Sequence, residues 1–399
     1  MRIRRCTTLW LEPRETAHFD LESLLAGGTG VVSAMAWFAH APHLPAPLPI
    51  DAQDVALLGE LGPSDWVEAA PWRERHGAGR VRALLRAGLL IGRGKAWAEQ
   101  RRADELFRDQ HWFALAAQCH ANSRWEGLDA AREVAEEGID TNEGLRARYG
   151  PPPPELHART EPQQRLRLPA APTSAFDALL DARATCRNFD TAAWLPQTAF
   201  ASMLARTFGA RGGVHAADDY DVLKKTSPSG GALHPTEAYL IVNRVEGIAP
   251  GLYHYHAGEH ALEPLPAPED LAAFARLAVA GQQWFADAHA LVVLAPRFAR
   301  SFWKYRKHAK AYRVVILDAG HMSQTLYLSA TELGLGAFVT AAINEVDIER
   351  AFGLTGYVDG PLAVCGFGIR AGKMATSELD PNRIVWPRRA SAPSPRDSG

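Results

Sequence analysis

Apolar residues are spaced in two ways along the second half of the chain, and the two spacings alternate. Apolar side chains three and four positions apart predict helices, whereas short continuous apolar runs predict strands. By this pattern we expect helices at residues 175–184, 198–208 and about 305–333, and strands at 238–242, 252–254, 290–295, 338–341 and 362–367. This order predicts an α+β domain in which helices flank a mixed sheet.

The first part of the chain has a helical pattern of its own. Residues 51–61 carry apolar side chains at helical spacing, and residues 80–91 read as an amphipathic helix that closes near Gly88 and passes into a short strand. Helix, turn, helix, glycine and strand in this order are typical of a winged-helix-like domain, which we expect within residues 1–150.

A winged helix can bind DNA through basic side chains on its second helix. Arg80, Arg82 and Arg86 are available there, but acidic residues lie nearby and no basic tail follows. The net charge of −2 gives no basic field for nucleic acid or for an anionic membrane. We therefore favour a peptide-docking or structural role for this domain, with no nucleic-acid partner.

Four consecutive prolines at residues 151–154 mark the cleanest boundary in the chain. Consecutive prolines favour the polyproline II conformation and cannot continue a helix, so they act as a spacer between folded units. We expect a linker at residues 151–173, a second domain at residues 174–372 and a C-terminal tail at residues 373–399.

The composition is typical of a packed, cytoplasmic protein. Of the 399 residues, 47% are apolar, and no uninterrupted apolar stretch is long enough to span a membrane. The start of the chain does not read as a signal peptide. The four cysteines lie far apart, without the spacing of a disulfide framework or of a zinc site, so we expect no metal.

Lys304 and Tyr305 place an amine beside a phenol just before the long predicted helix. Both groups can transfer protons once their surroundings shift their pKa values, so the two residues are a candidate acid–base pair. The alternative is a solvated basic face, because further Lys, Arg and His residues follow as far as Arg313.

Two other segments carry candidate binding chemistry. Residues 227–235 form a small-residue loop in which Gly230 and Gly231 let backbone amides approach a planar or anionic ligand, although the same residues suit an ordinary turn. Arg183 and Arg187 flank a hydroxyl at short spacing, which suits a phosphate group. The alternative for the arginines is a pair of surface residues.

Together, and in this order, the segments resemble the FMN-dependent nitroreductase superfamily and, within it, the SagB-type dehydrogenases that mature azole-containing peptides. The resemblance covers roughly residues 174–372. Its most specific match is Lys304 and Tyr305 followed by His321, and residues 251–255, Gly-Leu-Tyr-His-Tyr, are similar to a strand of the same branch.

The resemblance implies contacts to the flavin phosphate and ribityl chain, to the isoalloxazine ring, and to the flavin N5 edge. The residues are, in that order, Arg183, Ala184, Thr185 and Arg187; Ser229, Gly230, Gly231, Ala232 and His234; and the backbone amides of Ala341 and Ala342. Arg370 is implied as a further phosphate contact, and His321 as an orienting or flavin-side residue.

The resemblance further implies bound FMN, a precursor peptide as substrate, a cyclodehydratase complex as partner, and a homodimer. Oxidation of an azoline ring to an azole removes a hydride equivalent and a proton; the flavin accepts the hydride, and Tyr305 or Lys304 accepts the proton. Two alternatives stay open: a generic NAD(P)H-dependent nitroreductase or quinone reductase, and a non-catalytic flavoprotein scaffold in a peptide-maturation complex. The Lys304–Tyr305 pair and the extra N-terminal domain favour the dehydrogenase.

Overall fold

A computed structural model describes residues 1–387 of the chain, which form two compact units. The first unit contains residues 1–124 and 298–313, and the second contains residues 125–297 and the described residues from 314 onward. This division falls upstream of the proline run, and it assigns residues 298–313 to the first unit. The two units are described separately below.

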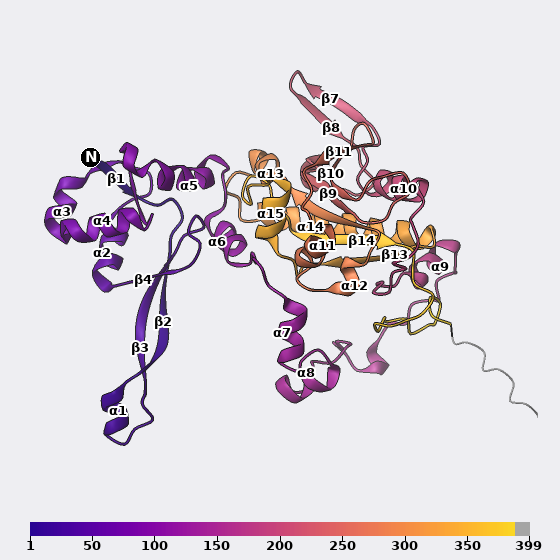
Figure 1. The fold of residues 1–399 in the computed structure, drawn as a ribbon, viewed down its shortest axis with the longest axis horizontal. Coiled ribbons are helices and arrows are strands. Elements are labelled where there is room, and N and C mark those ends of the chain that lie inside the picture. The colour runs from indigo at the N-terminus through magenta and orange to yellow at the C-terminus, as the bar shows by residue number, and fades with distance from the viewer. Residues whose placement is uncertain (388–399) are drawn as a thin grey trace, which may run out of the picture. The chain divides into compact units, whose positions relative to one another are not determined.

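The first unit is built from short strands and helices (Figure 1). Their bounds are β1 Arg2–Arg5, β2 Trp10–Phe19, α1 Leu21–Leu25, β3 Val31–His40, β4 Leu48–Ile50, α2 Ala52–Glu60, β5 Val67–Glu68, α3 Ala69–His76, α4 Ala78–Arg86, β6 Leu90–Gly92, α5 Ala98–Asp109, α6 Ala114–Asn122 and α13 Phe298–Lys304. A small sheet in the order β5-β1-β6 packs with α2 and α4 around a core that includes Ile3, Leu57, Val81 and Leu85.

The two helices predicted in the first unit are present as α2 and α4, but β5 and a further helix, α3, lie between them. Asp51 caps α2 by accepting hydrogen bonds from the amides of Gln53 and Asp54, and α3 meets α4 at Gly77, whose φ of +87° favours glycine. After β6, however, the chain continues into α5 instead of returning as a wing, and β1 supplies the central strand. The winged-helix assignment is therefore not confirmed.

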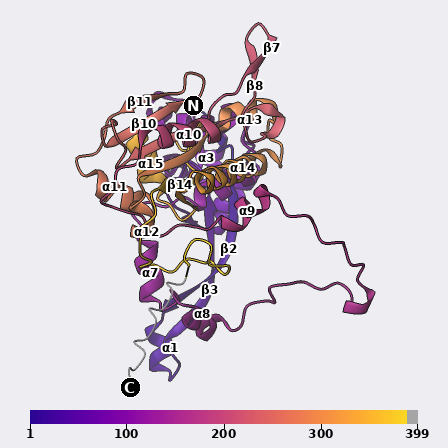
Figure 2. The same cartoon turned by 90° about the vertical axis from the view of Figure 1, so that its right-hand side faces the viewer.

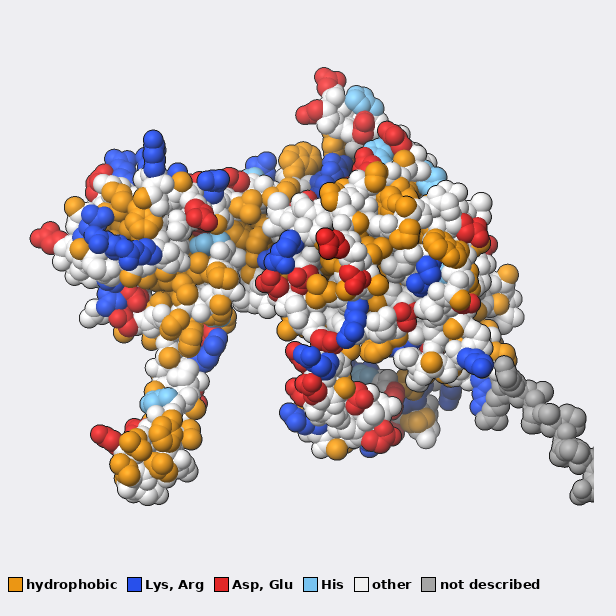
Figure 3. Space-filling view, in the orientation of Figure 1, with side chains coloured by type: hydrophobic (Ala, Val, Ile, Leu, Met, Phe, Trp, Pro, Cys, Tyr) orange, Lys and Arg blue, Asp and Glu red, His pale blue; other side chains and the backbone are white. Residues whose placement is uncertain are grey.

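A two-stranded arm was not foreseen from the sequence. Strands β2 and β3 pair over ten residues each, from Trp10 opposite His40 to Phe19 opposite Val31, and α1 lies at the tip (Figure 1). Figure 3 shows apolar side chains gathered at that tip, where Phe19 and Leu25 are exposed. Because β2 carries a proline and several charged residues, it lacks the apolar alternation by which a strand is recognised.

The helix predicted at about residues 305–333 is interrupted near its start. Helix α13 ends at Lys304, Lys307 adopts a φ of +51°, and the long helix α14 (Ala311–Glu332) begins only afterwards. Packing explains why α13 belongs to the first unit: the Trp112 ring lies 4.9 Å from that of Phe298 and 4.7 Å from that of Phe302, measured between centroids. Such an aromatic cluster buries a large apolar area.

The second unit contains most of α14 and a six-stranded sheet. Its other elements are α7 Ala130–Glu136, α8 Asn142–Tyr149, α9 Ala175–Ala182, α10 Gln197–Thr207, β7 Gly213–Ala217, β8 Tyr220–Leu223, β9 Thr236–Val242, β10 Gly251–His256, β11 Ala261–Leu265, α11 Leu271–Ala278, α12 Gln283–Ala286, β12 Ala290–Pro296, β13 Gly336–Thr340, α15 Glu345–Phe352 and β14 Ala363–Gly368. The sheet order is β11-β10-β9-β12-β14-β13.

Helices cover both faces of this sheet. Helices α10 and α14 pack on one face, against side chains such as Leu240 and Val292, while α11, α12 and α15 pack on the other, against side chains such as Ile241 and Val293. The α+β class is thus confirmed. The strand pairs of this sheet are antiparallel, and a parallel bridge between Thr185 and Ala337 adds the second direction.

Residues 150–173 run as an exposed stretch between α8 and α9, with a short 3-10 turn at Pro162–Gln164 (Figure 2). Three of the four cysteines are buried, and all four are free thiols. Among the helices of residues 1–387, none combines the length and the apolar character needed to cross a membrane. The cytoplasmic location stays a prediction.

Candidate functional site

The small-residue loop, residues 227–234, is tied to helix α14 of the second unit. The Ser229 hydroxyl donates a hydrogen bond to one oxygen of the Asp318 carboxylate at 2.5 Å, and the Gly230 amide donates to the other at 3.2 Å. Asp318 is buried, and about two helical turns further on, the hydroxyls of Thr325 and Ser227 lie 2.7 Å apart. The carboxylate of Asp318 therefore fixes the loop where it faces the helix.

The backbone of this loop adopts conformations that L-residues rarely accept. Gly231, Ala232 and His234 have φ values of +67°, +57° and +45°. A hydrogen bond from the His234 amide to the Ser229 hydroxyl, 3.0 Å long, helps to hold this shape. Because positive φ costs energy at non-glycine residues, such geometry is concentrated at ligand sites, where the surroundings impose it.

Gly230→Ala is expected to disturb the contact between the loop and α14. A Cβ atom at this position would lie 2.0 Å from Cγ1 of Val314, whose branched side chain has little freedom to move. We expect a loss of about 1–3 kcal/mol in the free energy of unfolding, the usual cost of overpacking. Thermal denaturation of Gly230→Ala and of the double variant Gly230→Ala/Val314→Ala checks this, because the second change should restore most of the loss.

The arginine-rich segment, residues 183–187, is extended and lies beside strand β13. The Cys186 amide donates to the Ala337 carbonyl at 2.8 Å. Odd-numbered residues of the segment are half-buried and even-numbered residues are buried, as expected when alternate side chains of an extended chain point to opposite sides. Within residues 1–387, the guanidinium groups of Arg183 and Arg187 form no ion pair with a carboxylate. The segment thus presents two uncompensated positive charges.

Tyr327 of α14 joins this segment and was not foreseen. Its hydroxyl lies 3.0 Å from the Thr185 hydroxyl and accepts a hydrogen bond from the Val339 amide at 3.1 Å, while the Arg183 guanidinium lies 5.3 Å from the ring centroid. Burial raises the pKa of Tyr327, which keeps the phenol protonated and able to donate. The only signal in the sequence was a phenol between two leucines in the second half of the long predicted helix.

Both the loop and the arginine-rich segment are hydrogen-bonded to helix α14. Asp318 holds the loop and Tyr327 holds the segment, nine residues further along the same helix. At 1.5 Å per residue the two attachment points are about 14 Å apart along the axis. His321 lies between them with an exposed side chain, and it is its backbone carbonyl that accepts a hydrogen bond from Ser227, at 3.3 Å.

Three other expected cofactor contacts have partners within the chain. The Ala342 amide donates to the Thr340 hydroxyl at 3.2 Å, although the neighbouring Ala341 is exposed. Arg370 forms an ion pair with Glu378 at 2.8 Å and donates to the Ala184 carbonyl at 3.0 Å. The guanidinium of Arg370 and the carbonyl of Ala184 are therefore engaged with each other.

The candidate acid–base pair lies in the first unit. Lys304 is exposed at the end of α13, and its ammonium nitrogen lies 5.6 Å from the centroid of the half-buried Tyr305 ring. The Tyr305 amide continues the helical bonding by donating to the Ser301 carbonyl at 3.1 Å. The ammonium group and the phenol ring are thus neighbours at the end of α13.

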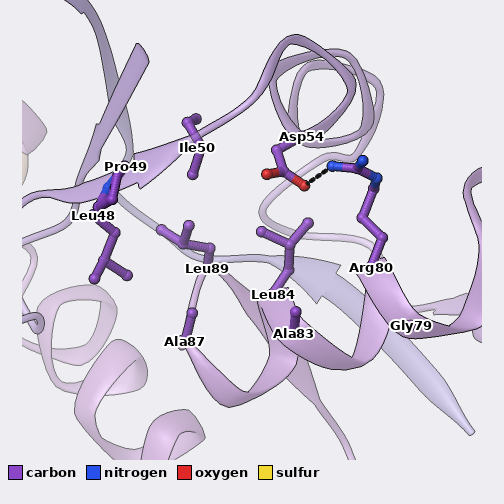
Figure 4. A pocket seen from close by; sticks show the side chains of 10 residues that line it. All are labelled: Leu48, Pro49, Ile50, Asp54, Gly79, Arg80, Ala83, Leu84, Ala87 and Leu89. Atoms are coloured by element: carbon purple, nitrogen blue, oxygen red, sulfur yellow. Dashed lines mark hydrogen bonds and ion pairs between the residues drawn. The ribbon is translucent and has the colours of Figure 1, made fainter. Parts of the chain in front are cut away.

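The first unit also contains a groove of about 550 Å³ between strand β4 and helix α4 (Figure 4). Its wall is mainly apolar and consists of Leu48, Pro49, Ile50, Gly79, Ala83, Leu84, Ala87 and Leu89, with Asp54 and Arg80 at one end. Arg80 is paired with Asp54 at 2.5 Å. Because β4 is an edge strand whose central residue, Pro49, has no amide hydrogen, the groove offers apolar contacts more than backbone pairing.

Comparison with known proteins identifies the domain that holds the loop. Residues 180–369 match the model of the nitroreductase family. The trifolitoxin-processing protein TfxB of Rhizobium leguminosarum bv. trifolii is 31% identical over 149 residues, which are 35% of this chain and 38% of that protein. The microcin B17-processing protein McbC of Escherichia coli is 27% identical over 157 residues, which are 38% of this chain and 57% of that protein.

The chain therefore spans about two-fifths and just over half of the lengths of these two relatives. Among solved structures, a chain of the E. coli microcin synthetase McbBCD complex with truncated pro-MccB17 bound is similar at 22% identity and a TM-score of 0.46, over 67% of this chain and 97% of that one. The family model covers the loop, the arginine-rich segment and α14 together. Residues 180–369 belong to the nitroreductase family, as the sequence resemblance indicated.

Proposed function

We propose that this protein is an FMN-dependent dehydrogenase that oxidises azoline rings to azoles in a ribosomally made, modified peptide. The observation that carries the proposal is the pairing of the Ser-Gly-Gly loop with the arginine-rich segment along α14, inside a nitroreductase-family domain. The first part suits a planar ring and the second suits a phosphate.

The residues present fit FMN. Arg183, Arg187 and the Thr185 hydroxyl offer two positive charges and a hydroxyl on one side of an extended segment, which matches a phosphate group. The loop at Ser229–Ala232 offers a backbone without bulky side chains for the ring. When bound, FMN would supply the two-electron oxidation. The chain shows no Gly-x-Gly-x-x-Gly motif between a strand and a helix, so a dinucleotide is not expected.

The proton that leaves the azoline requires a base, and we assign that role to Lys304 and Tyr305. A lysine can accept a proton only when neutral, and a tyrosine only when ionised. The Lys304 ammonium nitrogen lies 5.6 Å from the centroid of the Tyr305 ring, so the two groups are close enough to act on one substrate proton, and either Tyr305 or Lys304 is proposed as its acceptor. The same pair can hold the proton until it passes to water.

The relatives support the proposed substrate class. By their names, TfxB and McbC process trifolitoxin and microcin B17. The Lys304–Tyr305 pair carries the sequence resemblance to SagB-type dehydrogenases. A precursor peptide carrying azoline rings is therefore the proposed substrate, and a cyclodehydratase complex that forms those rings is the proposed partner.

The groove between β4 and α4 is proposed to dock this peptide through apolar side chains. Ala83→Trp would place an indole across the groove from an exposed helix position, so it should fill the groove without disturbing the core. We expect binding of the precursor peptide encoded with this protein to weaken by about tenfold or more, measured by fluorescence anisotropy. Arg82→Trp, at the neighbouring exposed position outside the groove, is the matched control, and equal affinity in both variants would return the first unit to a structural role.

A homodimer is proposed for the second unit. Helix α14 exposes Ile316 and Leu317, and helix α9 exposes Phe176 and Leu180, each about half accessible to solvent. Large apolar side chains exposed on neighbouring turns of a helix are typical of surfaces that a second protein covers. The mass of the purified protein in solution, measured by light scattering, tests this proposal.

The function itself is tested by incubating the FMN-loaded protein with a synthetic peptide that carries one azoline ring. A dehydrogenase removes about two mass units per ring, with reduction of the bound flavin. Consumption of NAD(P)H with small electrophiles and no change in peptide mass would instead indicate a generic reductase. Peptide binding without flavin turnover would indicate a scaffold.

A further inference from the structure

The carboxylate of Glu378, which lies beyond the predicted domain, is fully buried and accepts four hydrogen bonds. One oxygen accepts from the Arg187 amide at 2.5 Å and from the Asn188 side-chain amide at 2.8 Å. The other accepts from the Arg370 guanidinium at 2.8 Å and from the Trp386 indole at 2.7 Å. Burial raises the pKa of Glu378, but these donors lower it further than burial raises it, so the carboxylate is ionised.

The side chain of Asn188 forms further hydrogen bonds to the same C-terminal residues. Its amide nitrogen donates to the Thr376 carbonyl at 2.7 Å, and its oxygen accepts from the amides of Ala375 and Thr376 at 2.7 and 2.8 Å. All the hydrogen-bonding groups of one buried side chain are thus used to join residues 374–386, here called the clasp, to the end of the arginine-rich segment.

The clasp and strand β13 hold the arginine-rich segment from two directions. On the β13 side the Cys186 amide donates to Ala337, and on the clasp side Glu378 accepts the next amide, that of Arg187. Since successive amides of an extended chain point in opposite directions, these two bonds fix the register of the segment. The register determines which side chains face outward, so it determines where the two unpaired guanidinium groups lie.

Glu378 also pairs with one of the three arginines expected near the phosphate and leaves the charges of the other two free to bind it. Of the three arginines expected near the phosphate, Arg370 alone is paired with a carboxylate, that of Glu378. The guanidinium of Arg187 is close to the clasp but meets a carbonyl there, that of Ser377 at 3.4 Å. Glu378 therefore neutralises the guanidinium of Arg370, whereas it contacts Arg187 only at its backbone amide.

We propose that Glu378 is a positioning residue for the phosphate group of the cofactor: by anchoring the clasp to residues 187 and 188, it holds Arg183 and Arg187 in the arrangement that binds the phosphate. This inference rests on the proposed FMN binding. Residues 374–386, which the sequence analysis assigned to a C-terminal tail, are then part of the cofactor site.

The test compares two flavins that differ only in the phosphate. Apo-protein is titrated with FMN and with riboflavin, and binding is followed by quenching of flavin fluorescence. Glu378→Ala should weaken FMN binding by about 10–100-fold, because the charged contact orders the phosphate-binding segment, and should leave riboflavin binding within about threefold of the wild type. Glu332→Ala, which removes an ion pair with Arg206 in the same unit, is the matched control and should change neither.

Glu378→Gln is the second variant in this test and replaces Glu378→Ala if the latter does not fold. A glutamine can keep one oxygen on the Arg187 amide and on Asn188 while losing the pair with Arg370, so a smaller FMN-specific loss of about 3–10-fold is expected. Unchanged FMN affinity in a folded variant, or equal loss of FMN and riboflavin, would overturn the positioning role. A wild-type protein that binds no FMN would overturn the proposed function, and this inference with it.

Discussion

Lys304→Ala and Tyr305→Phe are each expected to slow azoline oxidation by about 10²–10⁴-fold, the usual contribution of a positioned acid or base. Each change removes a group that handles the proton. The hydrogen bonds that hold the loop and the arginine-rich segment come from Asp318 and Tyr327 of α14, which both variants retain. The flavin spectrum should therefore be nearly unchanged. Single-turnover rates with an azoline peptide measure the effect.

The control for this experiment is another lysine of the same basic stretch. Lys310 is exposed, like Lys304, but its neighbours in the sequence are Ala309 and Ala311, and Lys310→Ala should leave the rate close to that of the wild type. If Lys304 and Tyr305 only form a solvated basic face, all three variants will show near-wild-type rates. Loss of flavin from both variants would instead assign the pair to cofactor binding.

Removing both arginines of the segment is expected to abolish retention of FMN. Arg183→Ala or Arg187→Ala alone removes one charged contact to the phosphate, which corresponds to about 1.5–3 kcal/mol of binding free energy. The double variant should weaken binding by about 10²–10⁴-fold, less than a simple product because both groups act on one phosphate. Titration of the apo-protein with FMN measures the loss.

Salt dependence and a remote arginine provide the controls. Arg276→Ala changes an exposed arginine that pairs with Asp129 and should not alter flavin affinity. The affinity of the wild type should fall as salt rises, because the contacts are ionic, and that slope should flatten in the double variant. FMN affinity that stays at the wild-type level in the double variant would remove the arginines from the phosphate site.

The regular elements of the second unit were predictable because they bury apolar faces. Strands β9, β12 and β14 each contain a continuous, mainly apolar run, and helix α10 carries apolar residues at helical spacing, so pattern alone located them. The break before α14 was not predictable in this way. It is produced by a turn at Lys307 with positive φ and by the packing of α13 on Trp112, a contact between residues far apart in the sequence.

Some residues of the candidate site could also be predicted from the sequence, and others could not. The loop and the arginine-rich segment are local motifs, so the sequence predicted their residues and their chemistry. Tyr327 and Glu378 act through tertiary contacts, with Thr185 and with Arg187, and no spacing in the sequence reveals such contacts. Asp318 lies within the helix predicted at about residues 305–333, yet its role as the anchor of the loop follows only from the fold.

Oxidation of azoline rings by the flavin-loaded protein is tested by mass spectrometry of a single-azoline peptide. The FMN-loaded protein and the peptide are mixed under single-turnover conditions without oxygen, with flavin occupancy and flavin reduction measured on the same samples. We expect a loss of about two mass units from the peptide in step with bleaching of the flavin. An unchanged peptide mass at full flavin occupancy would contradict it.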